Sequence, residues 1–269
     1  MKNPLISVVM PAYNAAAFLR EAIDSVLLQR FTDFEFIIIN DGSVDESDTI
    51  IRSYPDPRIV YLVNETNKGL VFTLNRGVEN ARGQWIARFD ADDICKPDRL
   101  EKQIAYAAAH PDAKIIATTI ELIDESGNDI GIWNDDRNHT QTESIHRFLP
   151  FNNCIAHPTV LIDTRLLQTY RYDPDQRLSE DYDLWLRLHA DGYRVHKLGE
   201  PLLRHRILKS SFTRTTGKNL FFKLMRVKRR FAWRQMRKGK WSGFVLKTFF
   251  SSWMDAIKGA GKVIKQKIS

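Results

Sequence analysis

The sequence has no run of apolar residues long enough to span a bilayer, because no stretch approaches the ~18 consecutive apolar positions that such a helix needs. It has only two cysteines, Cys95 and Cys154, without a pairing motif, which suits a reducing cytoplasm and excludes a cysteine-based zinc site. A short apolar run near the N-terminus is interrupted by Pro11 and Asn14, so we expect a buried strand there and not a signal peptide.

Two phosphate-binding patterns are also missing. No G-x-G-x-x-G follows the first apolar run, and no G-x-x-x-x-G-K occurs anywhere, so the sequence supports neither a dinucleotide-binding fold nor a P-loop. What is present, 43% hydrophobic and 27% charged residues in a chain of 269, is the composition of a globular protein.

Charge divides the chain into two parts. Residues 1–216 hold 25 Lys and Arg against 32 Asp and Glu, whereas residues 217–269 hold 15 against a single acid. The net charge of +7 therefore combines a mildly acidic body with a strongly basic tail, and we take these as two domains.

Four short apolar runs alternate with amphipathic segments in the first hundred residues. This alternation predicts an α/β fold with a mostly parallel sheet flanked by helices. Ligands of such sheets bind beyond the carboxyl ends of the strands, so polar residues at those ends are the first candidates for chemistry. The predicted strands are Leu5–Met10, Phe34–Ile39, Arg58–Val63 and Gln84–Phe89.

Three acids, Asp90, Asp92 and Asp93, follow the fourth predicted strand directly. Clustered carboxylates repel one another, and a hard divalent cation with oxygen ligands relieves that repulsion. Mg²⁺ or Mn²⁺ fits, and would keep open positions for phosphate oxygens. The alternative is a solvated acidic turn before the next helix.

Two further acidic sites have both a functional and a structural interpretation. Asp41 ends the second strand, where it can bind a base or ribose, or can form an Asx turn. Glu180 and Asp181 open a helix, where one can act as a general base or both can complement the helix dipole. A helix N-terminus lowers a carboxylate's pKa, so the base needs desolvation to be effective.

Five segments occur in an order and spacing that resembles the family 2 glycosyltransferases of GT-A fold. They are SVVMPAYN (7–14), FIIINDGS (36–43), NKG (67–69), ARGQWIARFDADDI (81–94) and SEDYDLWL (179–186), and the resemblance covers residues 5 to about 212. It implies an inverting, metal-dependent transfer of a sugar from a nucleotide sugar, with UDP as the expected nucleotide. The acceptor would be a hydroxyl of a glycan or lipid-linked glycan in cell-surface polysaccharide synthesis.

The resemblance assigns roles to residues that match the family's motifs. Asp92 is the expected direct metal ligand, with Asp90 nearer the ribose or sugar and also a metal ligand. Asp181 matches the catalytic base, and Glu180 helps to place it. The remaining matches are donor-binding positions: Pro11, Tyr13, Asp41, Asn67 and Asn75.

One motif departs from the family pattern. A Tyr-Arg-x-His run is common after the last strand, but here the position of its His is taken by Leu208. Arg206, Lys209 or His205 would then contact the pyrophosphate, and we assign Arg206 to the donor site while favouring an ordinary strand histidine for His205. His157, before Pro158, either borders the acceptor cleft or packs in the interior.

The tail predicts two helical segments broken at Gly239. Apolar residues recur every four positions beside Lys and Arg, which is typical of an interfacial helix on an anionic membrane. Packing against the body and nucleic-acid binding are alternatives, and the bulky aromatics disfavour nucleic acid. The apolar positions are Trp241, Val245, Phe249, Trp253 and Ile257.

Three classes of function compete on this sequence. The favoured one is a cytoplasmic glycosyltransferase, peripheral on the inner face of the membrane. The second is an inactive relative that serves as a binding module, which the intact acids disfavour. The third is a nucleotidyltransferase, which would need a glycine-rich first loop where the chain has Ala12-Tyr13-Asn14.

Overall fold

The computed structural model describes residues 3–176, 179–208 and 220–268. The first half of the chain alternates strands and helices as predicted, and strands β1–β4 pair in parallel in the order β3-β2-β1-β4. The parallel expectation is confirmed for these strands. The elements are β1 (Ile6–Ala12), α1 (Ala16–Leu27), β2 (Phe34–Asn40), α2 (Ser47–Arg52), β3 (Ile59–Val63), α3 (Leu70–Asn80) and β4 (Trp85–Arg88).

The second half extends the sheet with mixed directions. β8 is antiparallel to β4 and β6, β9 is parallel to β6, and β5 is antiparallel to β9, so the sheet continues β4-β8-β6-β9-β5, with β7 beside β6. The sequence missed β5, β7 and the short helices of this half. The elements are β5 (Ile94–Cys95), α4 (Arg99–Ala109), β6 (Ile115–Ile123), β7 (Asp129–Gly131), α5 (Asn134–Asn138), α6 (Thr142–Phe148), the 3-10 turn η1 (His157–Thr159), β8 (Leu161–Asp163), α7 (Thr164–Tyr170), α8 (Glu180–Ala190) and β9 (Val195–Arg206).

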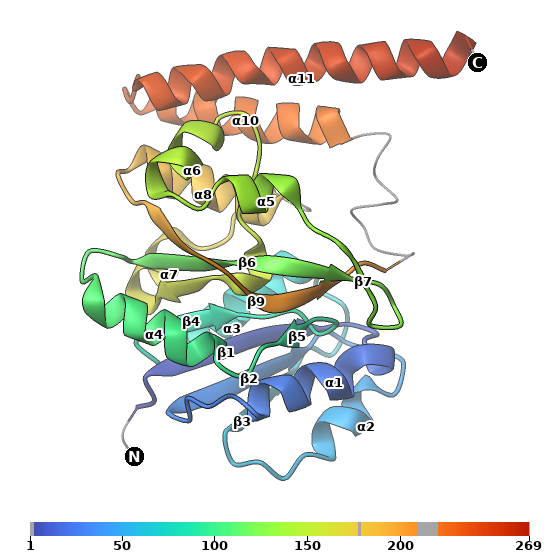
Figure 1. Ribbon diagram of the computed structural model, residues 1–269. Coiled ribbons are helices and arrows are strands. Elements are labelled where there is room, and N and C mark those ends of the chain that lie inside the picture. The colour runs from blue at the N-terminus through green and yellow to red at the C-terminus, as the bar shows by residue number, and fades with distance from the viewer. Residues whose placement is uncertain (1–2, 177–178, 209–219, 269) are drawn as a thin grey trace.

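The sheet lies between two layers of helices (Figure 1). Alternate residues of β2 divide between the two cores, because successive side chains of a strand point to opposite faces. Phe36 and Ile38 pack with α1, α2 and α4, whereas Ile37 and Ile39 pack on the side of α3, α7 and α8. A strand buried on both faces needs the continuous apolar run that the sequence shows.

The basic tail forms a helical hairpin that packs on α8. Helices α10 (Leu220–Arg237) and α11 (Gly243–Ile268) contact each other, and α10 contacts α8, as Figure 1 shows above the sheet. The expected break is confirmed, because Gly239 adopts a positive φ of 73° in the turn. Among the residues that the structure describes, no helix is long and apolar enough to cross a membrane.

The faces of this hairpin differ from the predicted stripe. Val245 is buried in the core together with Phe231, so one face of the tail packs on the body. A repeat of four residues drifts around a helix of 3.6 residues per turn, which is why one stripe reaches both faces. Up to residue 260 of α11, the large apolar side chains that are exposed are Phe250, Trp253, Met254 and Ile257.

Candidate active site

The acidic loop after β4 holds three carboxylates close together. Asp90 forms an ion pair with the buried Arg88 of β4. The carboxylate of Asp92 makes no hydrogen bond or ion pair within the described part of the chain. Burial and the neighbouring carboxylates of Asp93 and Asp90 raise the pKa of Asp92 to about 7. The fold therefore keeps this carboxylate in place although its neighbours repel its charged form.

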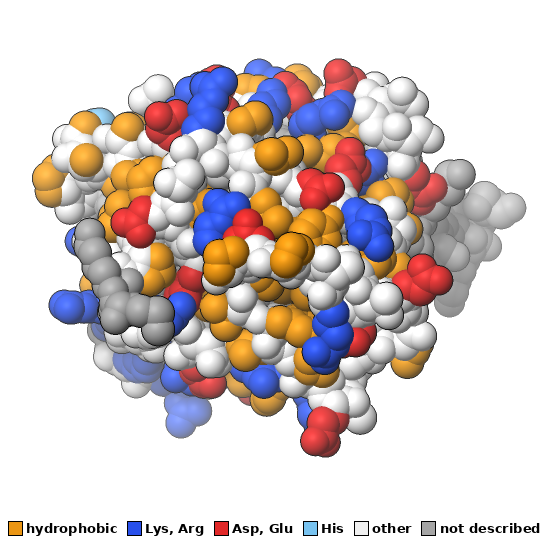
Figure 2. Space-filling view, turned by 90° about the horizontal axis from the view of Figure 1, so that it is seen from below, with side chains coloured by type: hydrophobic (Ala, Val, Ile, Leu, Met, Phe, Trp, Pro, Cys, Tyr) orange, Lys and Arg blue, Asp and Glu red, His pale blue; other side chains and the backbone are white. Residues whose placement is uncertain are grey.

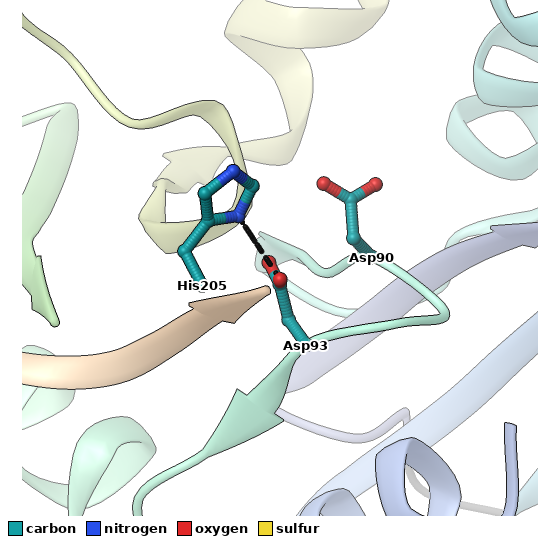
Figure 3. Close-up of side chains that lie close together, drawn as sticks. All are labelled: Asp90, Asp93 and His205. Atoms are coloured by element: carbon teal, nitrogen blue, oxygen red, sulfur yellow. Dashed lines mark hydrogen bonds and ion pairs between the residues drawn. The ribbon is translucent and has the colours of Figure 1, made fainter. Parts of the chain in front are cut away.

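Asp93 joins the acidic loop to the last strand of the sheet. Its Oδ1 accepts the backbone N–H of Arg206 at 2.9 Å and lies 3.0 Å from Nδ1 of His205 (Figure 3). Burial lowers the pKa of His205, but the carboxylates of Asp93, Asp90 and Asp92 outweigh it and raise that pKa to about 9. His205 is therefore an imidazolium partner of the cluster and not an ordinary strand histidine.

The donor set suits a hard divalent cation. Asp90, Asp93 and His205 place one ligand atom each within 4.8 Å of one another. Without a metal, the oxygens of Asp93 are engaged by His205 and by the backbone N–H of Arg206, and Asp90 is engaged by Arg88. The described residues therefore offer a cation two sets of ligands: Asp90 with Asp93 and His205, or Asp90 with Asp92, whose carboxylate has no partner among them.

Arg206 lies beneath the acidic loop, with 2% of its side chain exposed. Its Nε donates to the Asp92 carbonyl at 2.9 Å, its Nη1 donates to the carbonyls of Asp124 and Glu125, and its Nη2 pairs with Glu21. A pyrophosphate contact would require Arg206 to leave these partners. In this structure the guanidinium instead fixes the backbone of the loop, and the expected Lys209 lies outside the described residues.

Asp41 organises the loop that follows β3. Its Oδ1 accepts the Asn64 amide at 2.6 Å and the Lys68 N–H at 2.9 Å, and its Oδ2 accepts the Gly69 N–H at 2.9 Å. Next to it, Gly42 has a φ of 69°, and a Cβ there would lie 2.6 Å from the Thr66 backbone. Only glycine permits so close an approach.

The other expected donor residues divide into exposed and internal ones. The ring of Tyr13 is 49% exposed at the carboxyl end of β1, and Asn67 is exposed in the loop that Asp41 holds. Pro11 is buried within β1. Asn75 bonds the backbone of Tyr172 with both its amide atoms, at 2.9 and 3.0 Å, and so ties α3 to the segment before α8.

The acids of α8 lie at its N-terminus, where Glu180 is buried and Asp181 is partly buried. Oδ2 of Asp181 accepts the amide of Asn153 at 3.0 Å, and Oε2 of the buried Glu180 has no partner within the described residues. Burial and the nearby Asp181 raise the pKa of Glu180 to about 7, and burial also raises the pKa of Asp181 above its usual value. Desolvation therefore outweighs the helix N-terminus, as a general base requires.

Known proteins with similar sequence identify the family. The family model for glycosyl transferase family 2 matches residues 7–167. The chain belongs to this family. It is 36% identical to the O-antigen biosynthesis glycosyltransferase WbnJ of Escherichia coli over 212 residues, which are 77% of this chain and 81% of WbnJ.

Solved structures show the same GT-A fold as this family 2 chain. Residues 1–349 of TarS from S. aureus match with a TM-score of 0.71 and 17% identity over 94% of this chain and 72% of that one; TarS was also solved with UDP and with UDP-GlcNAc. The mannosyltransferase PcManGT of Pyrobaculum calidifontis, in complex with GDP-Man and Mn²⁺, matches with a TM-score of 0.65 and 14% identity over 97% and 76%.

The sequence missed Arg88 as a member of the site and left the role of His157 undecided. Arg88 is buried between the acidic loop and α8, and His157 bonds Tyr172 Oη through Nε2 at 2.8 Å in the same region. Burial lowers the pKa of His157 well below its usual value, so it is neutral there. The strand alternation that places Arg88 on the α8 side was available from the sequence, but its burial was not.

Proposed function

We propose that this family 2 chain is an inverting, metal-dependent glycosyltransferase that moves a sugar from a UDP-sugar to a hydroxyl of a glycan or lipid-linked acceptor. The observation that carries this is that two groups of carboxylates with raised pKa values, one after β4 and one at the start of α8, both interact with the buried Arg88. On the donor side, the carboxylate of Asp92 lies among other acids, and burial raises its pKa. At the start of α8, burial likewise raises the pKa values of Glu180 and Asp181. The role of WbnJ supports cell-surface polysaccharide synthesis.

The donor nucleotide is proposed to lie across the carboxyl ends of β1 and β2. The exposed ring of Tyr13 can stack on a base, with Pro11 fixing the strand that carries it. Asp41 holds the loop of Asn67 against the same edge, so a base or ribose would exchange with its backbone donors or bind beside them. Asn75 acts at a distance, through the Tyr172 backbone.

Asp92 and Asp90 would hold a divalent ion, Mn²⁺ or Mg²⁺, through oxygen ligands. When bound, such an ion would neutralise the negative charge that develops on a departing nucleoside diphosphate. Arg206 and the Asp93–His205 pair keep the two carboxylates in place from below. Asp181 would take the proton of the acceptor hydroxyl, with Asn153 orienting its carboxylate and Glu180 beside it.

A second proposal concerns the hairpin, which we place on an anionic membrane at the cytoplasmic face. Its outer side combines exposed apolar residues of α11 with exposed cations such as Arg226 and Lys258, and the Arg229 guanidinium lies 4.4 Å from the Trp253 ring centroid. Figure 2 shows the opposite face, where acidic and basic side chains are interspersed. Apolar burial beside basic charge is the pattern of an interfacial helix.

Two experiments test these proposals. Purified protein would be screened with nucleotide sugars and Mn²⁺ for release of nucleoside diphosphate, with EDTA as control. Release that needs both metal and an added acceptor supports a transferase, whereas binding without turnover supports an inactive relative, and pyrophosphate release from a nucleoside triphosphate supports a nucleotidyltransferase. Cosedimentation with anionic and neutral vesicles tests the hairpin, and equal partitioning to both would overturn its electrostatic part.

A further inference from the structure

Arg88 is a buried cation that the mechanism above does not use. Only 6% of its side chain is exposed, and it sits at the carboxyl end of β4, two residues before Asp90. One of its terminal nitrogens forms the ion pair with Asp90, while Nε has no hydrogen-bond partner in the described part of the chain. A buried donor without a partner is uncommon and requires an explanation.

Strand geometry points this side chain toward α8. Within β4, Trp85 and Ala87 belong to the core on the α1 side, and Ile86 belongs to the core that contains α8. Because alternate residues share a face, Arg88 lies on the α8 side with Ile86. The backbone of Arg88 is fixed there, since its N–H donates to Val160 at 2.9 Å and its carbonyl accepts from Arg99 at 3.0 Å.

The groups around Arg88 come from two parts of the chain, the acidic loop after β4 and the start of α8. From the donor side come Asp90 and, through space, Asp92. From the acceptor side, Glu180 and Asp181 of α8 lie near enough to interact with the charge of Arg88, and so do Tyr172 and His157, which are hydrogen-bonded to each other. The neutral Asn153 donates its side-chain amide to Asp181. Arg88 is thus the cation that these carboxylates share.

We propose that Arg88 is a positioning residue for glycosyl transfer, which orients Asp90 on the donor side and supplies the positive charge that faces Glu180 and Asp181 on the acceptor side. The inference rests on the proposed function. Its physical basis is that burial destabilises the charged form of the α8 acids, while a nearby cation favours it. Arg88 lowers the pKa of both acids against the larger effect of burial.

The test is the pH dependence of turnover in Arg88→Gln, Arg88→Lys and the wild type. Loss of the charge in Arg88→Gln should move the acid limb of the kcat profile to higher pH by about one unit, because an opposite charge nearby shifts a carboxyl pKa by roughly 1–3 units. Arg88→Lys keeps the charge but loses the fork geometry. Its acid limb should stay near that of the wild type while the plateau falls roughly tenfold to a hundredfold through misplacement.

The matched control is Arg58→Gln, which removes another ion-paired arginine, bound to Asp56 before β3. Its profile should match that of the wild type, and thermal unfolding checks that each variant is folded. An unshifted acid limb in Arg88→Gln, or a plateau unchanged in Arg88→Lys, would overturn the proposal. If Arg88→Gln does not fold, Arg88→Lys decides alone. A shift of the acid limb of the kcat profile in this variant, which keeps the positive charge, would contradict the proposal. Absence of turnover in the wild type would count against the proposed function instead.

Discussion

Nδ1 of His205 lies 3.0 Å from Oδ1 of Asp93, across 112 positions of the chain. This contact ties β9 to the acidic loop, and the adjacent backbone N–H of Arg206 binds the same carboxylate. The acidic loop is therefore shaped by a strand that the chain reaches only after α8.

The Asp93–His205 pair predicts a pH-dependent contribution to stability. The folded pKa of His205 is about 9, above its usual 6.5, so the pair stabilises the fold fully below about pH 6.5 and loses this effect as the pH rises through 9. His205→Gln should therefore lower the unfolding temperature of metal-free protein more at pH 6 than at pH 9.5. His110→Gln is the control, because the ring of His110 bonds the backbone carbonyl of Tyr106 and not a carboxylate. An equal loss at both pH values would contradict the charged pair.

Asp92→Asn should abolish the metal-dependent part of nucleoside diphosphate binding. The carboxylate of Asp92 has no protein partner in the described residues, and it is the one that a cation would relieve. Titration calorimetry with UDP, with and without Mn²⁺, measures this. Asp98→Asn, which removes an acid paired with Lys102 after the loop, is the control. A metal dependence that survives in Asp92→Asn would move the ion to Asp90 with Asp93.

The same substitution should stabilise the metal-free protein. The pKa of Asp92 is raised from 3.8 to about 7, so the folded state binds the proton more tightly and stability falls as the pH rises between these values. Asp92→Asn removes that penalty, and its unfolding temperature in EDTA should exceed that of the wild type at pH 8 but not at pH 4. A variant that is less stable at pH 8 would show that Asp92 has an attractive partner.

Asp181→Asn should keep donor binding and lower turnover about 10²–10⁴-fold, the usual effect of losing a general base. The substitution keeps the size of the side chain, and Asn153 can still bond the remaining oxygen. Asp183→Asn is the matched control, because it changes an acid on the same helix whose partner is Arg187. It should cost stability and leave the turnover of folded protein similar. If Asp181→Asn retains activity within a few-fold, the base lies elsewhere.

Local patterns allowed much of the site to be predicted. The acids at Asp90–Asp93 and at Glu180–Asp181 follow directly from a strand end and a helix start, and those features depend on residues close in sequence. The mixed half of the sheet could not be predicted, because β8, β6 and β9 pair across long stretches without a repeating pattern. The partnership of His205 with Asp93 depends on that pairing.

The sequence also did not show which charged side chains are buried. The sequence shows Arg88 and Arg206 as ordinary basic residues, and only the packed structure encloses them with carboxylates and carbonyls. In the tail, the aromatic repeat predicted helices correctly but not which face packs on α8. That choice depends on Val245 and Phe231, which meet the core only in three dimensions.

The two faces of the hairpin predict separable effects in the full-length protein. Phe231→Ala should lower the free energy of unfolding by about 3–5 kcal/mol, because the ring is buried against α8 and Phe244. Trp253→Ser removes a side chain that is 53% exposed, so the stability should change little while binding to anionic vesicles weakens. The exposed Leu28 of the opposite side supplies the control Leu28→Ser, which should change neither. Urea unfolding and vesicle cosedimentation at low and high salt measure the two properties. Binding that is unchanged in Trp253→Ser would remove the aromatic face from the membrane contact and leave the basic charge alone to explain it.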